Sequence, residues 1–77
     1  MGDTMINNLE AYKVFYYVAK CGSVTKAAGE LSISQPAVSQ AVKQLENTLD
    51  VSLFHRAAKG VRLTGEGELL YSYVAKG

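Results

Sequence analysis

The apolar positions of this 77-residue chain follow a helical period as far as about residue 50 and alternate in short runs after it. A first helix is predicted from about residue 8 to residue 20, because apolar side chains recur there at spacings of three and four. Gly22 is placed to end this helix in a left-handed conformation. The side chains expected on its buried face are Leu9, Tyr12, Phe15, Tyr16 and Ala19.

Two further helical segments are predicted on either side of a tight turn at residues 32–34. Ser23 is expected to cap the first, and Ser34 the second, in which Pro36 occupies the first turn and needs no N–H. Ile33 is expected to fill the corner between them. The predicted buried faces are Val24, Ala27, Ala28 and Leu31 in the first segment, and Val38, Ala41, Val42, Leu45 and Leu49 in the second.

The opposite face of the segment from 34 to 49 is polar and acid-poor. Gln35 is exposed at its start, and Glu46 lies only at its edge. A helix that shows amides, hydroxyls and a lysine on one side suits a polar, anionic partner, and duplex DNA is the first candidate. The residues of this face are Pro36, Ser39, Gln40, Lys43 and Asn47.

After residue 50 the pattern changes to short β-like runs at 51–54 and 61–63, joined by a basic loop at 55–60. Thr64 is expected to cap a last helix that begins with acidic residues, as its positive end favours. The apolar stripe of this helix is Leu69, Leu70, Tyr73 and Val74. Since the helix stops abruptly at Gly77, we expect the chain to be a fragment cut inside or just after a helix.

Several spaced motifs run through this pattern: Ala27-Ala28, Ser34-Gln35-Pro36-Ala37-Val38-Ser39, Leu45-Glu46, Leu53-Phe54, Arg56 and Leu63-Thr64-x-x-Gly67. With them, residues 9 to about 74 resemble the N-terminal DNA-binding domain of LysR-type transcriptional regulators. The fold implied is mainly α, a winged helix-turn-helix with a three-helix core, a two-stranded β wing and a C-terminal linker helix. Asp50 stands where the family usually has glycine. Gln40 stands where arginine is common, and this second difference suggests an altered base preference.

The resemblance implies a DNA-binding domain at residues 1–63 and the start of a linker or dimerisation helix at 64–77. Family members typically bind as dimers or tetramers of dimers, and their sites are interrupted palindromes that carry a T…A signature. An effector-binding domain, absent from this fragment, usually takes a small molecule that tunes transcription. No cofactor is expected within the fragment itself.

Charge and composition narrow the function further. The net charge is only +1, but residues 13–62 hold seven cations against three acids, and residues 51–65 hold three cations and no acid. One cysteine, Cys21, and one histidine cannot build a disulfide or a metal cluster, and no catalytic constellation is present, so an enzyme is not expected. The chain lacks an apolar run long enough to span a membrane, and we expect a cytoplasmic protein.

Candidate roles follow for two sets of residues that would touch DNA. Gln35 leads as a base-reading side chain, since glutamine can bond an adenine edge in bidentate fashion. The other candidates for base contacts are Pro36, Ala37, Ser39, Gln40 and Lys43. Candidates for phosphate or minor-groove contacts are Ser23, Thr25 and Lys26 before and in the second helix, and Arg56, Lys59 and Arg62 in the wing at 55–62.

Each role has a plainer alternative. Ser23 and Pro36 serve equally well as helix-start devices, and a charged hairpin is often only solvated. Leu69, Leu70, Tyr73 and Val74 are predicted to pair two copies of the chain, because they exceed what so small a core needs. The competing function is a winged-helix module that binds protein without DNA, which an acidic outer helix face would have favoured.

Overall fold

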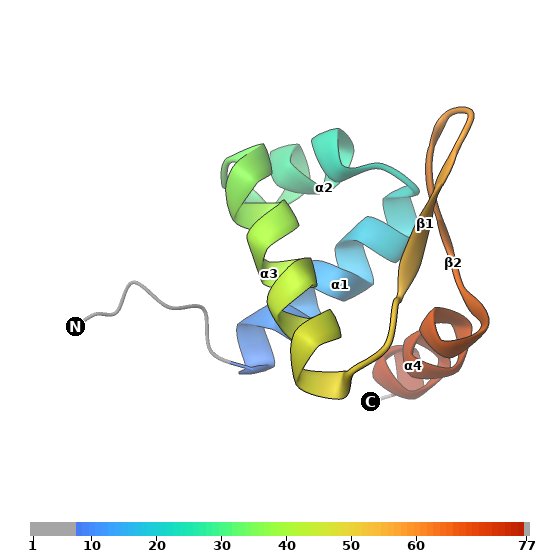
Figure 1. Cartoon of the computed structure of the whole chain (residues 1–77). Coiled ribbons are helices and arrows are strands. Elements are labelled where there is room, and N and C mark those ends of the chain that lie inside the picture. The colour runs from blue at the N-terminus through green and yellow to red at the C-terminus, as the bar shows by residue number, and fades with distance from the viewer. Residues whose placement is uncertain (1–7, 77) are drawn as a thin grey trace.

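The computed structural model describes residues 8–76, within which the chain forms four helices and one two-stranded sheet (Figure 1). The predicted winged helix-turn-helix is confirmed, whereas residues 1–7 of the predicted domain and Gly77 of the predicted linker lie outside this range. The elements are α1 (Asn8–Cys21), α2 (Val24–Leu31), α3 (Gln35–Leu49), β1 (Phe54–Ala57), β2 (Gly60–Leu63) and α4 (Gly65–Lys76).

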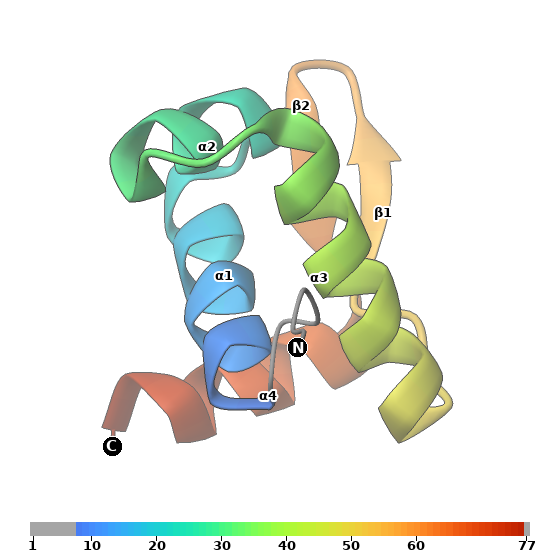
Figure 2. The ribbon, with the colours of Figure 1, turned by 90° about the vertical axis from the view of Figure 1, so that its left-hand side faces the viewer.

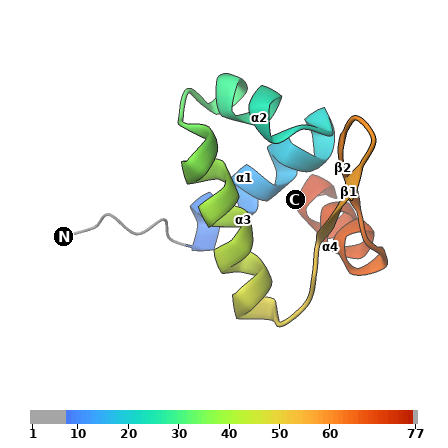
Figure 3. The ribbon, with the colours of Figure 1, turned by 45° about the horizontal axis from the view of Figure 1, so that its top comes forward.

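Helix α1 is the centre of the arrangement, since it packs against α2, α3 and α4. Viewed from the side in Figure 2, α1 and α3 run beside each other, α2 lies across one end of the pair and α4 across the other. The β1–β2 hairpin stands beside the helices as a wing (Figure 3). Among residues 8–76, this layout leaves one side of α3 without a covering element, between α2 and the wing (Figure 2).

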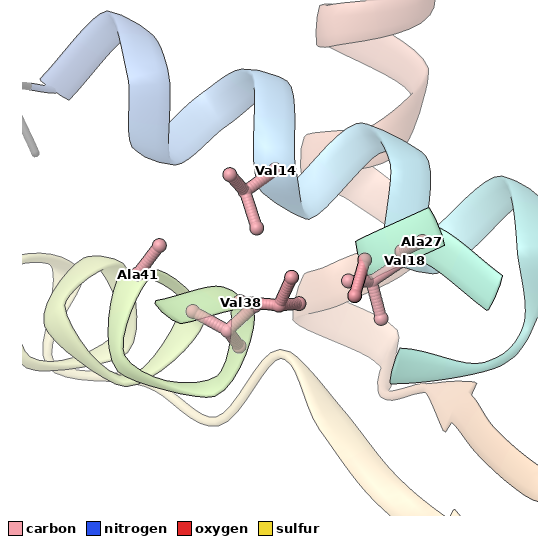
Figure 4. Packing of buried hydrophobic residues seen from close by; sticks show 7 residues of the cluster. Val14, Val18, Ala27, Val38 and Ala41 are labelled. Atoms are coloured by element: carbon pink, nitrogen blue, oxygen red, sulfur yellow. The ribbon is translucent and has the colours of Figure 1, made fainter. Parts of the chain in front are cut away.

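A first core cluster joins the three helices of the helix-turn-helix. Val38 of α3 faces Val14 and Val18 of α1, with Ala27 of α2 next to them (Figure 4). The small side chains of Ala27 and Ala28 let α2 approach closely, and Ala27 is completely buried. The cluster therefore fixes the angle at which α3 is presented.

A second cluster ties the wing and α4 to the same helices. It is built on Phe15 and on the fully buried Leu53, with Leu45 and Ala11 beside them. The Phe15 ring meets the Phe54 ring with centroids 5.3 Å apart at 48°, a tilted geometry that aromatic pairs favour. Wing and helices thus share one continuous apolar interior.

The predicted buried face of α1 was wrong in its orientation. Phe15 is buried as predicted, but Leu9 is 81% exposed, and the other buried residues are Ala11, Val14 and Val18. Helix α1 has neighbours on several sides, so the many apolar residues of the sequence left its inward face ambiguous. The tyrosines of α1 are half-buried.

Two residues predicted to be inside lie outside, and both are close to helix ends. Ile33 is 38% exposed, because backbone bonds rather than its side chain close the corner: its N–H donates to Ala28 O over 3.1 Å. Leu49 is 37% exposed in the last turn of α3. Asp50 then ends that helix in the left-handed region, with φ 58°.

The first strand begins three residues later than the predicted run at 51–54, and the second begins one residue earlier than the predicted run at 61–63. Phe54 pairs with Leu63 and Ala57 with Gly60, so most of the predicted loop is strand and only residues 58 and 59 form the turn. Gly60 has φ 117°, and a side chain there would collide with the carbonyl oxygen of Gly22. The neighbouring Val61 N–H donates to that oxygen over 3.1 Å, which fastens the wing to the corner between α1 and α2.

Candidate nucleic-acid interface

The start of α3 is held by its cap. The Ser34 hydroxyl oxygen accepts from Ala37 N–H over 3.2 Å, and its carbonyl accepts from Val38 N–H over 3.1 Å, which confirms the predicted cap. Gln35 and Pro36 are left exposed in the first turn, whereas Ala37 is half-buried. Gln35 is therefore free to reach outward, and Ala37 is the least accessible of the predicted base contacts.

The outer face of α3 forms a shallow, open hollow. It is lined by Ser39, Gln40, Lys43, Gln44 and Asn47. Ser39, Gln40 and Lys43 were predicted to contact bases, and Asn47 was predicted on this face without a role, whereas Gln44 was not predicted. Gln44 is four residues after Gln40, and Asn47 is four residues after Lys43, and this spacing places both on the same face of the helix. The described lining offers amides, a hydroxyl and one cation, with no carboxylate among them.

Helix α2 presents its N-terminus beside this face. The Ser23 hydroxyl oxygen accepts from Lys26 N–H over 3.2 Å, so it serves as the predicted cap. Thr25 and Lys26 are exposed in the first turn. Because the positive end of a helix attracts anions, these two side chains are better placed for a phosphate than the capping serine.

The wing separates its cations instead of clustering them. Arg56 lies opposite Val61, and His55 opposite Arg62, so the two arginines project from opposite faces of the ribbon. Lys59 is in the turn at the tip. The face that bears Arg56 is the one turned to the helices, because Phe54 and Val61 pack from it into the core.

A groove runs between this face of the wing and α3. Its floor is apolar and includes Val42, Phe54 and Val61, and its polar lining consists of Ser39, Lys43, Glu46 and Arg56. The structure thus brings Arg56 together with Ser39 and Lys43, two residues predicted from a different element. Arg62 is not part of that set.

Glu46 joins α3 to the root of the wing. One carboxylate oxygen, Oε2, accepts from the backbone N–H of Leu53 over 2.7 Å and from that of Phe54 over 3.3 Å. On the other side of the same segment, Leu53 O accepts from Thr64 N–H over 3.0 Å. The role of Glu46 was not foreseen from its position at the edge of the helix face.

Thr64 links the wing root to α4. Its hydroxyl donates to Ser52 O over 2.6 Å and accepts from Gly67 N–H over 3.0 Å, so the predicted cap of α4 is confirmed. Gly67 is buried against Leu53, and a side chain at this position would run into the Leu53 carbonyl. Helix α4 therefore lies directly against the wing root.

The predicted dimer stripe of α4 divides between two faces. Leu70 and Val74 pack onto the second core cluster, whereas Leu69 and Tyr73 are 63% and 69% exposed. The two pairs are each four residues apart but are offset by one residue, which turns them about 100° from each other around the helix. Only the second pair is available to a partner.

Other chemistry is sparse in the part of the chain that the structure describes. Cys21 is a half-buried free thiol, and no group of three His, Cys, Asp or Glu side chains lies close enough to hold a metal ion. Between residues 8 and 76, no helix is both long and apolar enough to cross a membrane. The polar surface around α3 is thus the main candidate site.

Comparison with known proteins places this chain in a family. Residues 9–68 match the model of bacterial regulatory helix-turn-helix proteins of the lysR family. The chain is 39% identical over 69 residues to the HTH-type transcriptional regulator PerR of Escherichia coli K12, a match that covers 90% of this chain and 23% of PerR. The chain therefore spans about a quarter of the length of such curated relatives.

Two solved complexes are similar to the whole described fold. The BenM DNA-binding domain with catB site 1 DNA superposes with a TM-score of 0.86 at 36% identity, covering 91% of this chain and 78% of that one. The CbnR DNA-binding domain in its DNA complex gives a TM-score of 0.85 at 30% identity, with 91% and 80% covered.

Proposed function

The chain belongs to the lysR family of bacterial regulatory helix-turn-helix proteins, and from that premise we propose that it binds double-stranded DNA sequence-specifically as part of a transcriptional regulator. The role is binding rather than catalysis, in keeping with relatives that are named transcriptional regulators. One observation carries the proposal. Ser39 and Lys43 of α3 and Arg56 of the wing line one groove between the helix and the wing.

Helix α3 supplies the reading surface in this proposal. The major groove admits an α-helix, and amide side chains such as those on the outer face of α3 discriminate bases there. Gln35 at the exposed first turn reads a base edge, and Pro36 and Ala37 touch thymine methyl groups. Gln40 and Lys43 follow at later turns, and Ser39 reaches bases or phosphates.

The flanking elements supply position and affinity. Thr25 and Lys26 hold a phosphate at the start of α2, with Ser23 as their cap. Arg56 extends from the inner face of the wing toward the minor groove, where a narrow groove attracts arginine. Lys59 and Arg62, at the tip and on the outer face, contribute long-range attraction.

Two wider features belong to the same proposal. Leu69 and Tyr73 on α4 are offered to a second copy of the chain, so that a homodimer binds an interrupted palindrome. A small-molecule effector acts on a separate domain of the longer protein. The second feature is supported by the length of the curated relatives, of which this chain spans about a quarter.

Selection from a random duplex pool tests the function. We expect enrichment of a half-site flanked by T and A, together with a fall in affinity as salt rises that reflects several phosphate contacts. Tight binding without enrichment would leave α3 as a non-specific element. Absence of binding at low salt, by protein shown to be folded, would refute the proposal and favour a protein-binding module.

A further inference from the structure

We propose that Glu46 is a positioning residue that sets where the wing stands relative to α3, a role that rests on the proposed DNA binding. A carboxylate on the surface facing DNA is unfavourable for affinity, because it repels phosphates. Glu46 nevertheless shares the groove with Lys43 and Arg56. Its hydrogen bonds give the reason for this placement.

The carboxylate joins two elements that are separated in the chain. Glu46 is in the fourth turn of α3, and the amides it accepts from belong to Leu53 and Phe54, seven and eight residues later. Hydrogen bonds from backbone N–H to a charged oxygen are stronger than neutral ones. The first amides of the wing are therefore tied to the helix that we propose reads the bases.

Arg56 is two residues beyond Phe54 on the same strand, so a distance of about 7 Å separates it from the tie. A small pivot of β1 about Phe54 would displace the guanidinium from a minor-groove path. Strand β2 is fixed separately, by the bond from Val61 N–H to Gly22 O. Glu46 thus adds a charged hydrogen-bonded anchor at the root of the strand that carries Arg56.

Three substitutions separate reach from charge. Glu46→Ala removes the acceptor, Glu46→Asp keeps the charge but withdraws it by one methylene, and Glu46→Gln keeps an acceptor without charge. Glu30→Ala, at an exposed acid on α2, is the matched control for lost charge. The probe is the duplex enriched by the wild-type chain, and circular dichroism verifies that each variant is folded.

We expect Glu46→Ala and Glu46→Asp to weaken binding about tenfold, and Glu46→Gln to remain within about threefold of wild type. The decisive measurement is a double-mutant cycle with Arg56→Ala. If Glu46 acts through the wing, its removal costs less than about twofold once Arg56 is absent. Should Glu46→Ala fail to fold, Glu46→Asp supplies the cycle.

Additive losses in the cycle would overturn the proposal while leaving the DNA-binding function intact. Tighter binding by both Glu46→Ala and Glu30→Ala would also overturn it, since charge alone would then explain Glu46. A wild-type chain that binds no duplex removes the proposed function first, and this proposal with it.

Discussion

Replacing Gly67 by alanine tests how closely α4 is seated on the wing root. A Cβ built on Gly67 lies 2.9 Å from the Leu63 Cδ2 and 3.1 Å from the carbonyl carbon of Leu53, and it is closer still to the Leu53 oxygen. The Leu63 side chain can turn away, but the Leu53 carbonyl cannot, because its oxygen accepts from Thr64 N–H. The helix or the wing root must therefore shift.

The cost can be worked from these contacts. An overpacked site of this kind loses about 1–3 kcal/mol. A weakened bond between Thr64 and Leu53 adds about 1 kcal/mol, and the better helix propensity of alanine returns about 0.5–1 kcal/mol. We expect Gly67→Ala to lower the free energy of unfolding by about 2 kcal/mol. For a domain of this size that corresponds to a melting temperature lower by about 8–16 °C.

Gly29→Ala is the matched control, because Gly29 is also inside a helix and nothing lies within 4 Å of the Cβ that would be added. It should raise the free energy of unfolding by about 0.5–1 kcal/mol. Urea unfolding followed by far-ultraviolet circular dichroism measures both values on the same scale. If Gly67→Ala proved as stable as Gly29→Ala, the close contact between α4 and the wing root would be refuted.

Four further predictions concern the reading surface, the wing and the helix ends. Gln35→Ala should relax base preference at one position of each half-site and cost about 1–3 kcal/mol of specific binding, as repeated selection would reveal; unchanged preference removes this residue from the reading set. Arg56→Ala should weaken binding to all sequences and reduce the slope of log K against log salt by about 1, whereas an unaltered slope would turn the wing away from DNA. Leu69→Ser combined with Tyr73→Ser should abolish weak self-association in sedimentation without lowering stability, and a wild-type chain that is monomeric at high concentration would contradict this. Asp50→Gly should raise the free energy of unfolding by up to about 1 kcal/mol, because Asp50 has φ 58°, and urea unfolding that shows a loss would contradict that reasoning.

The sequence predicted the helices and their caps well, because these depend on local chemistry. Ser23, Ser34 and Thr64 each accept the backbone bond expected of a cap. The inward face of α1 was not predictable in the same way. Tyr12, Tyr16 and Val18 are all apolar enough to be buried, and only the packing of three neighbouring elements decides among them.

The candidate site was predicted residue by residue more readily than as an arrangement. The outer face of α3, Asn47 included, follows from helical spacing alone, and Gln44 could have been added by the same rule. The separation of Arg56 from Arg62 depends on the register of a hairpin whose first strand starts three residues later than the apolar pattern indicated and whose second starts one residue earlier. The tie from Glu46 to Phe54 spans two elements, so no local pattern signals it.

Helix α4 has one apolar face on the core and another exposed, so its rotation about its own axis is fixed relative to the rest of the domain. Since Leu70 and Val74 are seated on the core, the direction in which Leu69 and Tyr73 point is set by the DNA-reading part of the molecule. A protein fused to continue the helix would inherit that direction. Each added residue would turn the fused partner by about 100° and advance it by about 1.5 Å, and seven residues would nearly restore the starting angle. The angle between a fused partner and the surface of α3 could therefore be chosen by counting residues.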